Sequence, residues 1–257
     1  MSKIIAIANQ KGGVGKTTTA VNLSSCLAVK GRKVLIIDID PQGNTTSGLG
    51  IDKTQFKTSI YDVIINGFQI EESLIKTKID NLYISPSNIQ LAGAEVELVS
   101  VISRETRLKN ALDSVKKLYD FIIVDCPPSL GLITVNALTA ADTILVPIQC
   151  EYYALEGLSQ LMNTVKIVQK HLNPNLQVEG VVLTMFDART NLSIQVVDEV
   201  KKYFGNKVYR TIIPRNVRLS EAPSYGLPII LYDSKSKGAE CYMELADEVI
   251  EYSEGKK

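Results

Sequence analysis

The sequence predicts an α/β fold: a doubly wound, mostly parallel sheet with helices on both faces. Two observations lead to this prediction. Short apolar runs alternate with helix-like segments from one end of the chain to the other, which is typical of strand–helix–strand units joined by right-handed crossovers. Several of these runs consist almost entirely of valine, isoleucine and leucine, as expected of strands that are covered on both faces.

The predicted elements follow one another in regular order. A strand at 3–9 leads through a glycine-rich stretch into a helix at 16–30, which Gly31 would end. Further strands are expected at 33–40, 81–86, 121–125, 143–149, 178–186 and 208–214, and further helices at 104–118, 155–172, 192–204 and 238–252. No internal repeat, low-complexity tract or linker interrupts this order, so we expect a single domain over 1–257.

Composition narrows the possible classes of function. Lysine plus arginine and aspartate plus glutamate balance at 28 each, so nucleic-acid binding would require a local basic patch. The cysteines (Cys26, Cys126, Cys150, Cys241) lack metal-type spacing, and the single histidine, His171, is expected to be solvated. This pattern argues for buried reduced thiols and against a zinc site or a histidine base. No run approaches the ~18 apolar residues of a membrane span, and the first strand leaves no room for a signal peptide, so we expect a cytoplasmic protein.

A glycine-rich stretch between the first strand and the first helix has the pattern of a phosphate-binding loop. Its backbone N–H groups, together with the helix N-terminus, would form an anion site. Lys16 would reach the β- and γ-phosphates of a nucleotide, and the Thr17 hydroxyl would bind Mg²⁺ directly. The usual pattern has a glycine where this chain has Gln10, and a second lysine, Lys11, follows it. The stretch consists of Lys11, Gly12, Gly13, Val14, Gly15, Lys16, Thr17 and Thr18.

Carboxylates end two of the predicted strands. Asp38 and Asp40 end the second strand, and strand alternation would place them on one face. Asp40 could orient or deprotonate a water that attacks the γ-phosphate, whereas Asp38 would lie closer to the metal and its waters. Asp125 follows four apolar residues of the fourth strand and is expected to hold Mg²⁺ through water. The alternative for Asp38 and Asp40 is a pair that only caps a loop.

Several motifs of this sequence resemble the ParA/MinD superfamily of ATPases. KGGVGKTT, DIDPQGN and IIVDCPPSLG are similar to its deviant Walker A, Walker A′ and Walker B motifs. Three later stretches, QCEYYALEGL, TMFDARTNLS and IPRNVRLSEAPSYGLPI, resemble the chromosomal ParA branch, Soj. The similarity extends from about Lys3 to Tyr252 and so covers nearly the whole chain.

The resemblance implies an Mg²⁺-dependent ATPase, whose intrinsic turnover we expect to be low. ATP would be bound by residues 11–18, with adenine contacts from Pro214 and Asn216. The resemblance also implies that Lys11 reaches the phosphates of a partner subunit in an ATP-sandwich homodimer, and that Asp40 serves hydrolysis. A second cation at the γ-phosphate would lower the barrier, because phosphoryl transfer spreads charge over the γ-oxygens.

The resemblance further implies that the dimer binds DNA. Arg189 and Arg218 match DNA-binding positions of the family, and Arg215, Lys235 and Lys237 are further candidates for one basic patch. These side chains could instead be solvated or could line the nucleotide pocket. Because no aromatic platform accompanies them, we expect phosphate contacts that are insensitive to base sequence and weakened by salt.

These expectations combine into a molecular switch for chromosome partitioning. ATP would close a homodimer that coats nucleoid DNA, and hydrolysis would release it. The family implies that the basic N-terminal tail of a ParB-type protein stimulates this hydrolysis. The same switch could also regulate replication initiation.

Other functions in the superfamily compete with this interpretation. A MinD-like membrane positioner requires a basic amphipathic helix at its C-terminus, but GAECYMELADEVIEYSEGKK is acidic until its last two residues. An electron carrier requires cluster-binding cysteines, and none lies in a matching motif. A metabolic ATP-dependent ligase of the dethiobiotin-synthetase type requires a separate substrate pocket, for which no residue cluster stands out. Because the first strand begins near the N-terminus, no DNA-reading extension is expected there.

Overall fold

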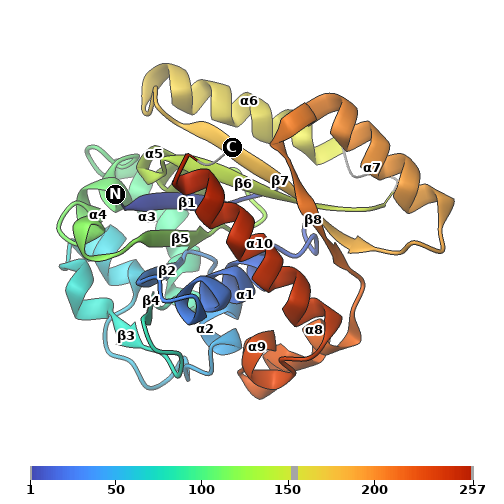
Figure 1. The fold of residues 1–257 in the computed structure, drawn as a ribbon. Helices are drawn as coiled ribbons and strands as arrows, with labels where there is room; N and C mark the ends of the chain where they lie inside the picture. The colour runs from blue at the N-terminus through green and yellow to red at the C-terminus, as the bar shows by residue number, and fades with distance from the viewer. Residues whose placement is uncertain (1, 152–155, 256–257) are drawn as a thin grey trace.

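The computed structural model describes residues 2–151 and 156–255 and confirms the predicted fold class (Figure 1). Its sheet has the strand order β3-β4-β2-β5-β1-β6-β7-β8, and all neighbouring strands in it are parallel except β3 and β4. The strands are β1 (Lys3–Ile7), β2 (Val34–Asp38), β3 (Ile75–Lys76), β4 (Leu82–Ser85), β5 (Phe121–Asp125), β6 (Thr143–Gln149), β7 (Gln177–Phe186) and β8 (Val208–Pro214). The α-helices are α1 (Lys16–Val29), α2 (Asn44–Gly48), α3 (Ala94–Glu97), α4 (Arg107–Leu112), α5 (Leu132–Ala140), α6 (Glu156–His171), α7 (Asn191–Phe204), α8 (Val217–Glu221), α9 (Ile229–Tyr232) and α10 (Lys237–Ser253).

Helices cover both faces of the sheet, and each face has its own apolar core. Side chains of β1 alternate, so that Ile5 and Ile7 lie in one core and Ile4 and Ala6 in the other. Helices α1, α8, α9 and α10 cover the first face, whereas α4, α5, α6 and α7 cover the second. This two-sided burial explains why the strands are almost continuously apolar.

The C-terminal helix α10 lies across α1 (Figure 1). Its apolar residues, among them Tyr242, Leu245 and Val249, are buried in the core on that face. The apolar side of α10 is therefore already packed against protein. Among the helices within 2–151 and 156–255, none is both long enough and apolar enough to span a bilayer.

All the predicted strands are present in the structure. Three of them match the prediction residue for residue, at 121–125, 143–149 and 208–214. β1 and β2 each end two residues before the predicted end, at Ile7 and Asp38. The antiparallel strand β3 was not predicted, because its two residues are too few to form a pattern.

One helix prediction requires correction, and the helix α5 was missed. The predicted helix at 104–118 is wrong in its extent: it forms only α4 and a separate 3₁₀ turn at Lys116–Leu118. Asp113 and Ser114 follow α4, and the Ser114 hydroxyl donates to the Ala111 carbonyl, a local bond that competes with helix propagation. The helix α5 was not predicted, because nearly all of its residues are buried and it lacks the polar stripe of an amphipathic helix.

The predicted helices at 192–204 and 238–252 are confirmed as α7 and α10. The helix predicted at 155–172 corresponds to α6, but its first predicted residue lies outside the described residues. The four cysteines are free and buried, as predicted. His171, at the end of α6, is exposed as expected.

Candidate nucleotide-binding site

The carboxyl ends of β1, β2 and β5 meet at one edge of the sheet. β5 lies between the other two strands, and Asp125 at its end is paired in register with Ile7 of β1 and Asp38 of β2. The glycine-rich loop leaves β1 at this edge and enters α1. The residues that the sequence assigned to phosphate binding and hydrolysis are thus brought to the edge where ligands of doubly wound sheets bind.

Two glycines of the loop have backbone conformations that favour glycine. Gly13 has φ +73° and Gly15, which precedes α1, has φ +88°, in the left-handed region that other residues rarely adopt. Gln10 and Gly12 have no positive φ. The glycine that the usual pattern places at Gln10 is therefore unnecessary for this backbone.

The two lysines of the loop occupy different environments. Lys16 is only 7% exposed, and its Nζ donates to the Lys11 carbonyl at 3.0 Å. Burial lowers the pKa of the Lys16 ammonium, and nearby Asp125 opposes this shift. The Lys11 backbone N–H donates to Asn9 Oδ1, but its Nζ has no hydrogen bond or ion pair with any part of the chain that the structure describes.

A buried pair of carboxylates lies beneath the loop. The Thr17 and Thr45 hydroxyls both donate to Asp125 Oδ2, at 2.8 and 2.7 Å. Asp125 Oδ1 is buried and has no partner among the described residues. Burial, and then the neighbouring charge of Asp38, raise the pKa of Asp125. The free oxygen of Asp125 is thus suited to accept a hydrogen bond from a metal-bound water.

Asp38 is held by the segment that follows β2. Its Oδ2 accepts hydrogen bonds from the Thr46 backbone N–H at 2.8 Å and the Thr46 hydroxyl at 2.7 Å. Its Oδ1 accepts from the Asp40 N–H at 3.2 Å. The sequence analysis missed Thr45 and Thr46; the available signal was two adjacent hydroxyl residues in a short segment after an aspartate-rich strand end. These contacts make Asp38 a residue that positions α2 and Asp40.

Asp40 lies two residues beyond the end of β2 and is nearly buried. Its Oδ1 accepts a hydrogen bond from the Gln42 N–H at 2.9 Å. Its Oδ2 makes no hydrogen bond within the described part of the chain. Asp40 also lies close enough to Lys16 to oppose the lowering of that lysine's pKa. One carboxylate oxygen therefore remains available near the expected position of the phosphates.

A cavity of about 300 Å³ adjoins the phosphate loop. Pro214 and Asn216, the predicted adenine contacts, both line it. Asn216 Oδ1 accepts a hydrogen bond from the Leu219 N–H and so caps α8. The Thr184 hydroxyl donates to the Val14 carbonyl at 2.9 Å, which connects β7 to the loop. The other lining residues, which the sequence analysis did not identify, include Thr184, Met185, Leu219, Ser220, Pro223 and Tyr242.

The donor atoms at this edge fit Mg²⁺. Mg²⁺ prefers oxygen ligands, retains several waters and binds through one or two protein groups plus substrate phosphates. The hydroxyl of Thr17 and the free oxygen of Asp125 supply that kind of donor set. Within 2–151 and 156–255 no group of three or more His, Cys, Asp or Glu side chains forms a metal cage.

Comparison with known proteins identifies the family. A protein-family model described as an AAA domain matches residues 2–178. Over 97% of its length, the chain is 66% identical to the sporulation initiation inhibitor protein Soj of Bacillus subtilis (strain 168), and it covers 98% of that protein. It is 55% identical to the chromosome partitioning protein ParA of Myxococcus xanthus (strain DK1622), with 97% and 88% of the two chains covered. This chain belongs to the ParA/MinD superfamily.

Within that superfamily, these two relatives support a chromosome-partitioning ATPase of the ParA/Soj type. The fold is also similar to that of a solved structure of cobyrinic acid a,c-diamide synthase from Mycobacterium smegmatis with bound ADP and magnesium. The TM-score is 0.88 at 37% sequence identity, over 100% of this chain and 97% of the other. The phosphate loop, the carboxylates and the adjoining cavity are thus parts of a ParA-type ATPase.

The cations predicted to bind DNA lie near the ends of β7 and β8 in this ParA-type fold. Arg189, in the loop after β7, contacts Asp187 through Nη2 at 2.7 Å. Arg215, just after β8, donates its backbone N–H to the Phe186 carbonyl at the end of β7. Its charge also helps to lower the pKa of Asp187, after the larger contribution of the Arg189 hydrogen bonds. Arg189 is therefore paired with Asp187, whereas Arg215 contacts Glu151 at 3.4 Å and also lines the cavity beside the phosphate loop.

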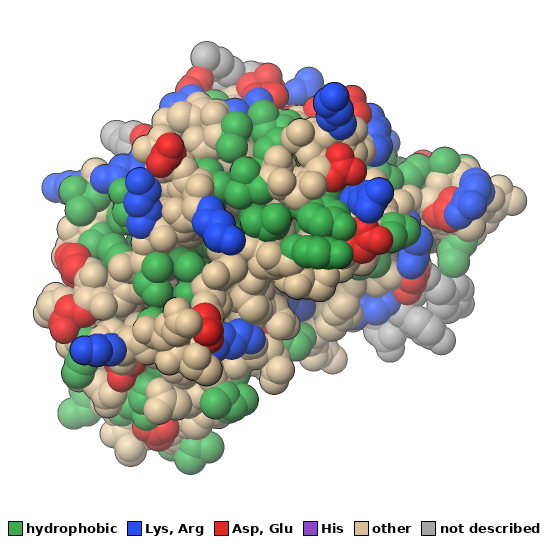
Figure 2. Space-filling model, turned by 90° about the horizontal axis from the view of Figure 1, so that it is seen from below, with side chains coloured by type: hydrophobic (Ala, Val, Ile, Leu, Met, Phe, Trp, Pro, Cys, Tyr) green, Lys and Arg blue, Asp and Glu red, His purple; other side chains and the backbone are tan. Residues whose placement is uncertain are grey.

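The other three cations predicted to bind DNA lie on α8, between α9 and α10, and at the start of α10. Arg218, on α8, contacts Glu221 at 2.9 Å and Asp233 at 3.5 Å. Lys235 follows Asp233 and is exposed, and Lys237 contacts Glu240 at 2.9 Å. The predicted patch is therefore interrupted by acidic partners. Figure 2 shows that lysine and arginine side chains are interspersed with acidic ones on the face seen from below.

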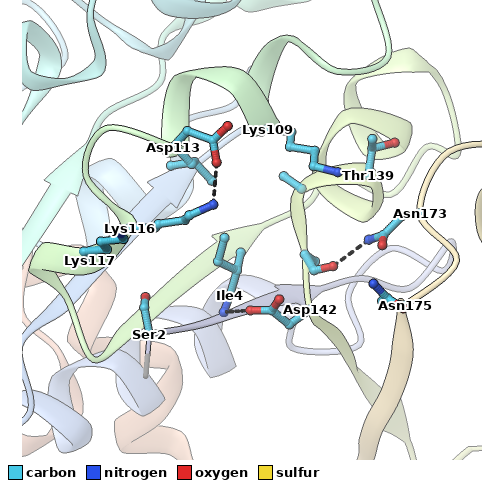
Figure 3. Close-up of a pocket in the computed structure, with 13 residues that line it drawn as sticks. Ser2, Ile4, Lys109, Asp113, Lys116, Lys117, Thr139, Asp142, Asn173 and Asn175 are labelled. Carbon is cyan, nitrogen blue, oxygen red and sulfur yellow. Dashed lines mark hydrogen bonds and ion pairs between the residues drawn. The ribbon is translucent and has the colours of Figure 1, made fainter.

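A second cavity, of about 420 Å³, lies at the opposite edge of the sheet (Figure 3). Its lining includes Ile4 at the start of β1 and Asp142 just before β6, so it adjoins the amino ends of the strands. Asp142 accepts a hydrogen bond from the Ile4 N–H, and Lys116 contacts Asp113. None of the residues that the sequence assigned to nucleotide or DNA binding lines this cavity.

Proposed function

We propose that this protein is an ATP-dependent dimerising switch that partitions chromosomes. It binds ATP and Mg²⁺, closes a homodimer around the nucleotides, binds DNA without sequence preference, and releases it after hydrolysis. A ParB-type protein with a basic N-terminal tail stimulates that hydrolysis. The observation that carries this proposal is the contrast between buried Lys16 and the unpaired ammonium of Lys11 in one loop.

Lys16 and the loop backbone bind the nucleotide of their own chain. On ATP binding, the Lys16 ammonium exchanges its bond to the Lys11 carbonyl for the β- and γ-phosphates. The Thr17 hydroxyl would hold Mg²⁺ directly and Asp125 would hold it through water, with Asp38 supporting the same region. When bound, Mg²⁺ neutralises phosphate charge. Adenine lies in the cavity beside Pro214 and Asn216.

Lys11 serves the nucleotide of the partner subunit. Its Nζ has no carboxylate partner in the described chain that it would have to leave, and a lysine side chain is long and flexible enough to reach outwards. Charge spreads over the γ-oxygens during phosphoryl transfer, so a cation supplied by a partner raises the rate. This arrangement makes hydrolysis depend on dimerisation.

Replacing Lys11 with alanine separates these two roles. Lys11→Ala is expected to retain ATP binding by the monomer, because Lys16 and the loop backbone remain. The rate of hydrolysis should fall by about 10³-fold or more, the range for a cation supplied in trans, and a stable dimer should not form. Calorimetry, ATPase assays and sedimentation measure the three quantities. Normal dimerisation and turnover would show that Lys11 has no such role.

DNA phosphates replace the acidic partners of the arginines. An exposed ion pair contributes only about 0–1 kcal/mol, so Arg189 and Arg218 can exchange Asp187 and Glu221 for phosphates at little cost. Each arginine occurs twice in a dimer, so both copies can bind one DNA molecule and avidity makes binding depend on ATP. Arg215, Lys235 and Lys237 add to the same surface.

Charge reversal at Arg189 or Arg218 tests the DNA surface. Arg189→Glu or Arg218→Glu should weaken ATP-dependent DNA binding on all sequences. The slope of the logarithm of the binding constant against the logarithm of the salt concentration should fall by the equivalent of about one to two phosphate contacts for each substituted arginine. ATP binding and dimerisation should be retained. Lys76→Glu is the matched control, because Lys76 is an exposed, ion-paired cation on β3 outside this surface. DNA affinity equal to that of the control would place the binding surface elsewhere.

One experiment tests the proposal as a whole. DNA retention and oligomer size are measured side by side for the Asp40→Ala protein with no nucleotide, with ADP and with ATP. Dimerisation and salt-sensitive DNA binding with ATP alone are expected. Binding of DNA by the monomer, or an ATP-bound monomer that ignores DNA, would contradict the proposed switch and its nucleoid location.

The similarity to cobyrinic acid a,c-diamide synthase favours one alternative function, that of a metabolic ligase. Such an enzyme would hydrolyse ATP in proportion to amide formation. Incubation with cobyrinic acid, ammonia and ATP therefore discriminates the two functions. ADP release that requires the acid would support the ligase, whereas ADP release that requires DNA and a ParB-type protein supports the switch.

A further inference from the structure

The turn between Asp40 and α2 connects the residue that we assign to hydrolysis with the threonines that support the site. The Gln42 N–H donates to Asp40 Oδ1 at 2.9 Å, and the Gly43 N–H donates to the Asp40 carbonyl at 2.8 Å. α2 begins directly after Gly43 and carries the two threonines that hold Asp125 and Asp38. A displacement of this turn would therefore change both the carboxylate of Asp40 and the support of the region expected to hold Mg²⁺.

The side chain of Lys53 lies against this turn. Its Nζ donates to the Gln42 carbonyl, and it forms no ion pair with any residue in 2–151 or 156–255. A Cβ at position 43 would lie only 2.9 Å from Lys53 Cε and 3.0 Å from the Ser87 carbonyl oxygen. Lys53 and the Ser87 carbonyl thus occupy the space that a side chain at Gly43 would fill.

This arrangement differs from that of an ordinary surface lysine. Such a side chain usually keeps its ammonium in water. Lys57, on the same loop, is an example, because it is exposed and makes no hydrogen bond or ion pair within the described residues. Lys53 is instead partly buried and directs its charge to one backbone carbonyl. Because a hydrogen bond from a charged donor is stronger than one between neutral groups, Lys53 restrains the peptide group that joins Gln42 to Gly43.

The restraint reaches Asp40 through Gln42. Both peptide groups of Gln42 are bonded, the N–H to Asp40 Oδ1 and the carbonyl to Lys53 Nζ. One oxygen of Asp40 is thus fixed by Gln42, and the direction of the other oxygen, which would orient the attacking water, depends on where that N–H lies. A small misplacement of a group that positions the reactants can lower a rate by as much as about 100-fold. Loss of the Lys53 bond would therefore slow hydrolysis, although Lys53 does not line the nucleotide cavity.

We infer that Lys53 is a positioning residue for hydrolysis, which holds the turn after Asp40 in the conformation that orients the attacking water. The inference rests on the proposed role of Asp40 and adds a residue that lies outside the three nucleotide-binding motifs. ATP binding should not depend on Lys53, because Lys16 and the loop backbone bind the phosphates. The effect of Lys53 is thus confined to the rate at which bound ATP is hydrolysed.

Substitutions of Lys53 test this inference. Lys53→Met keeps a long side chain against Gly43 but removes the charged donor, so the single-turnover rate of ATP hydrolysis should fall by about 10- to 100-fold. ATP affinity by calorimetry and ATP-dependent dimerisation by sedimentation should be unchanged, which also shows that the variant folds. Lys53→Gln, which is neutral and shorter, should behave in the same way, whereas Lys53→Arg restores a charged donor and should retain most of the rate. Lys57→Met is the matched control and should hydrolyse ATP normally.

A double variant shows whether Lys53 acts through Asp40. Because the Asp40→Ala protein has no carboxylate to position, adding Lys53→Met to it should cause no further loss of rate. An equal loss in both backgrounds would overturn the inference, as would weaker ATP binding or dimerisation of Lys53→Met, or a normal or higher rate for Lys53→Met and Lys53→Gln. Each of these results would leave the role of Asp40 intact. If Asp40→Ala itself keeps its turnover, the proposed role of Asp40 and this inference both fail.

Discussion

Replacing Lys16 with alanine should abolish ATP binding. Lys16 is the cation of the loop that is buried against the site, and its ammonium is held there by a single exchangeable bond to a backbone carbonyl. Hydrogen bonds to charged groups contribute about 1.5–3 kcal/mol each, and Lys16 would contact two phosphates. The loss therefore corresponds to roughly 10²–10⁴-fold in affinity, enough to leave no binding in calorimetry at ordinary concentrations.

The appropriate control for Lys16→Ala is Lys11→Ala, in the same loop. Both variants remove a lysine, but only Lys16 is expected to hold the nucleotide of its own chain. Thermal unfolding without nucleotide establishes that both variants fold. ATP affinity of Lys16→Ala equal to that of the unsubstituted protein would exclude Lys16 as the phosphate ligand.

Replacing Asp40 with alanine should block hydrolysis without preventing ATP binding. One oxygen of Asp40 accepts a bond from Gln42 and the other is free to orient a water at the γ-phosphate. Positioning or deprotonation of an attacking group typically contributes 10²–10⁴-fold, so turnover should fall by at least about 100-fold. Because ATP is bound but not hydrolysed, the ATP-bound dimer should accumulate, which is measured by sedimentation together with single-turnover assays.

Asp52→Ala is the matched control for Asp40→Ala. Asp52 is a nearby carboxylate on an exposed loop beyond α2, and it accepts hydrogen bonds from the Thr54 N–H and hydroxyl. The Asp52→Ala protein should hydrolyse ATP at the normal rate. If Asp40→Ala is found as a monomer with ATP bound, or keeps its turnover, Asp40 does not serve hydrolysis.

The strands and the phosphate loop could be predicted because their signals are local. The run FIIVD at 121–125 has four apolar residues before its aspartate, and its short length and β-branched residues favour a strand covered on both faces. The loop requires Gly13 and Gly15 at fixed positions before a helix, and this requirement is set by backbone sterics alone. These features depend on neighbouring residues and are visible in any short window of the sequence.

The helices were less predictable where packing outweighs local preference. α5 was missed because burial on all sides removes the amphipathic pattern. The predicted helix at 104–118 stops after Leu112, where Asp113 and Ser114 favour a turn and Val115 is drawn into the core. In both segments the local structure is set by packing against residues that are distant in the sequence, and a short stretch of sequence does not include those residues.

The sequence by itself was sufficient for every strand except β3, for the phosphate loop, for the paired aspartates and for the resemblance to the family. Only the folded chain revealed that Thr45 and Thr46 hold Asp125 and Asp38, and that the predicted arginines are paired with acidic neighbours. The folded chain also shows that the segment 89–102 has one side in the core and four apolar side chains in solvent. The physical reason is distance along the chain: Thr45 and Asp125 are separated by 80 positions and meet because parallel strands bring their carboxyl ends to one edge.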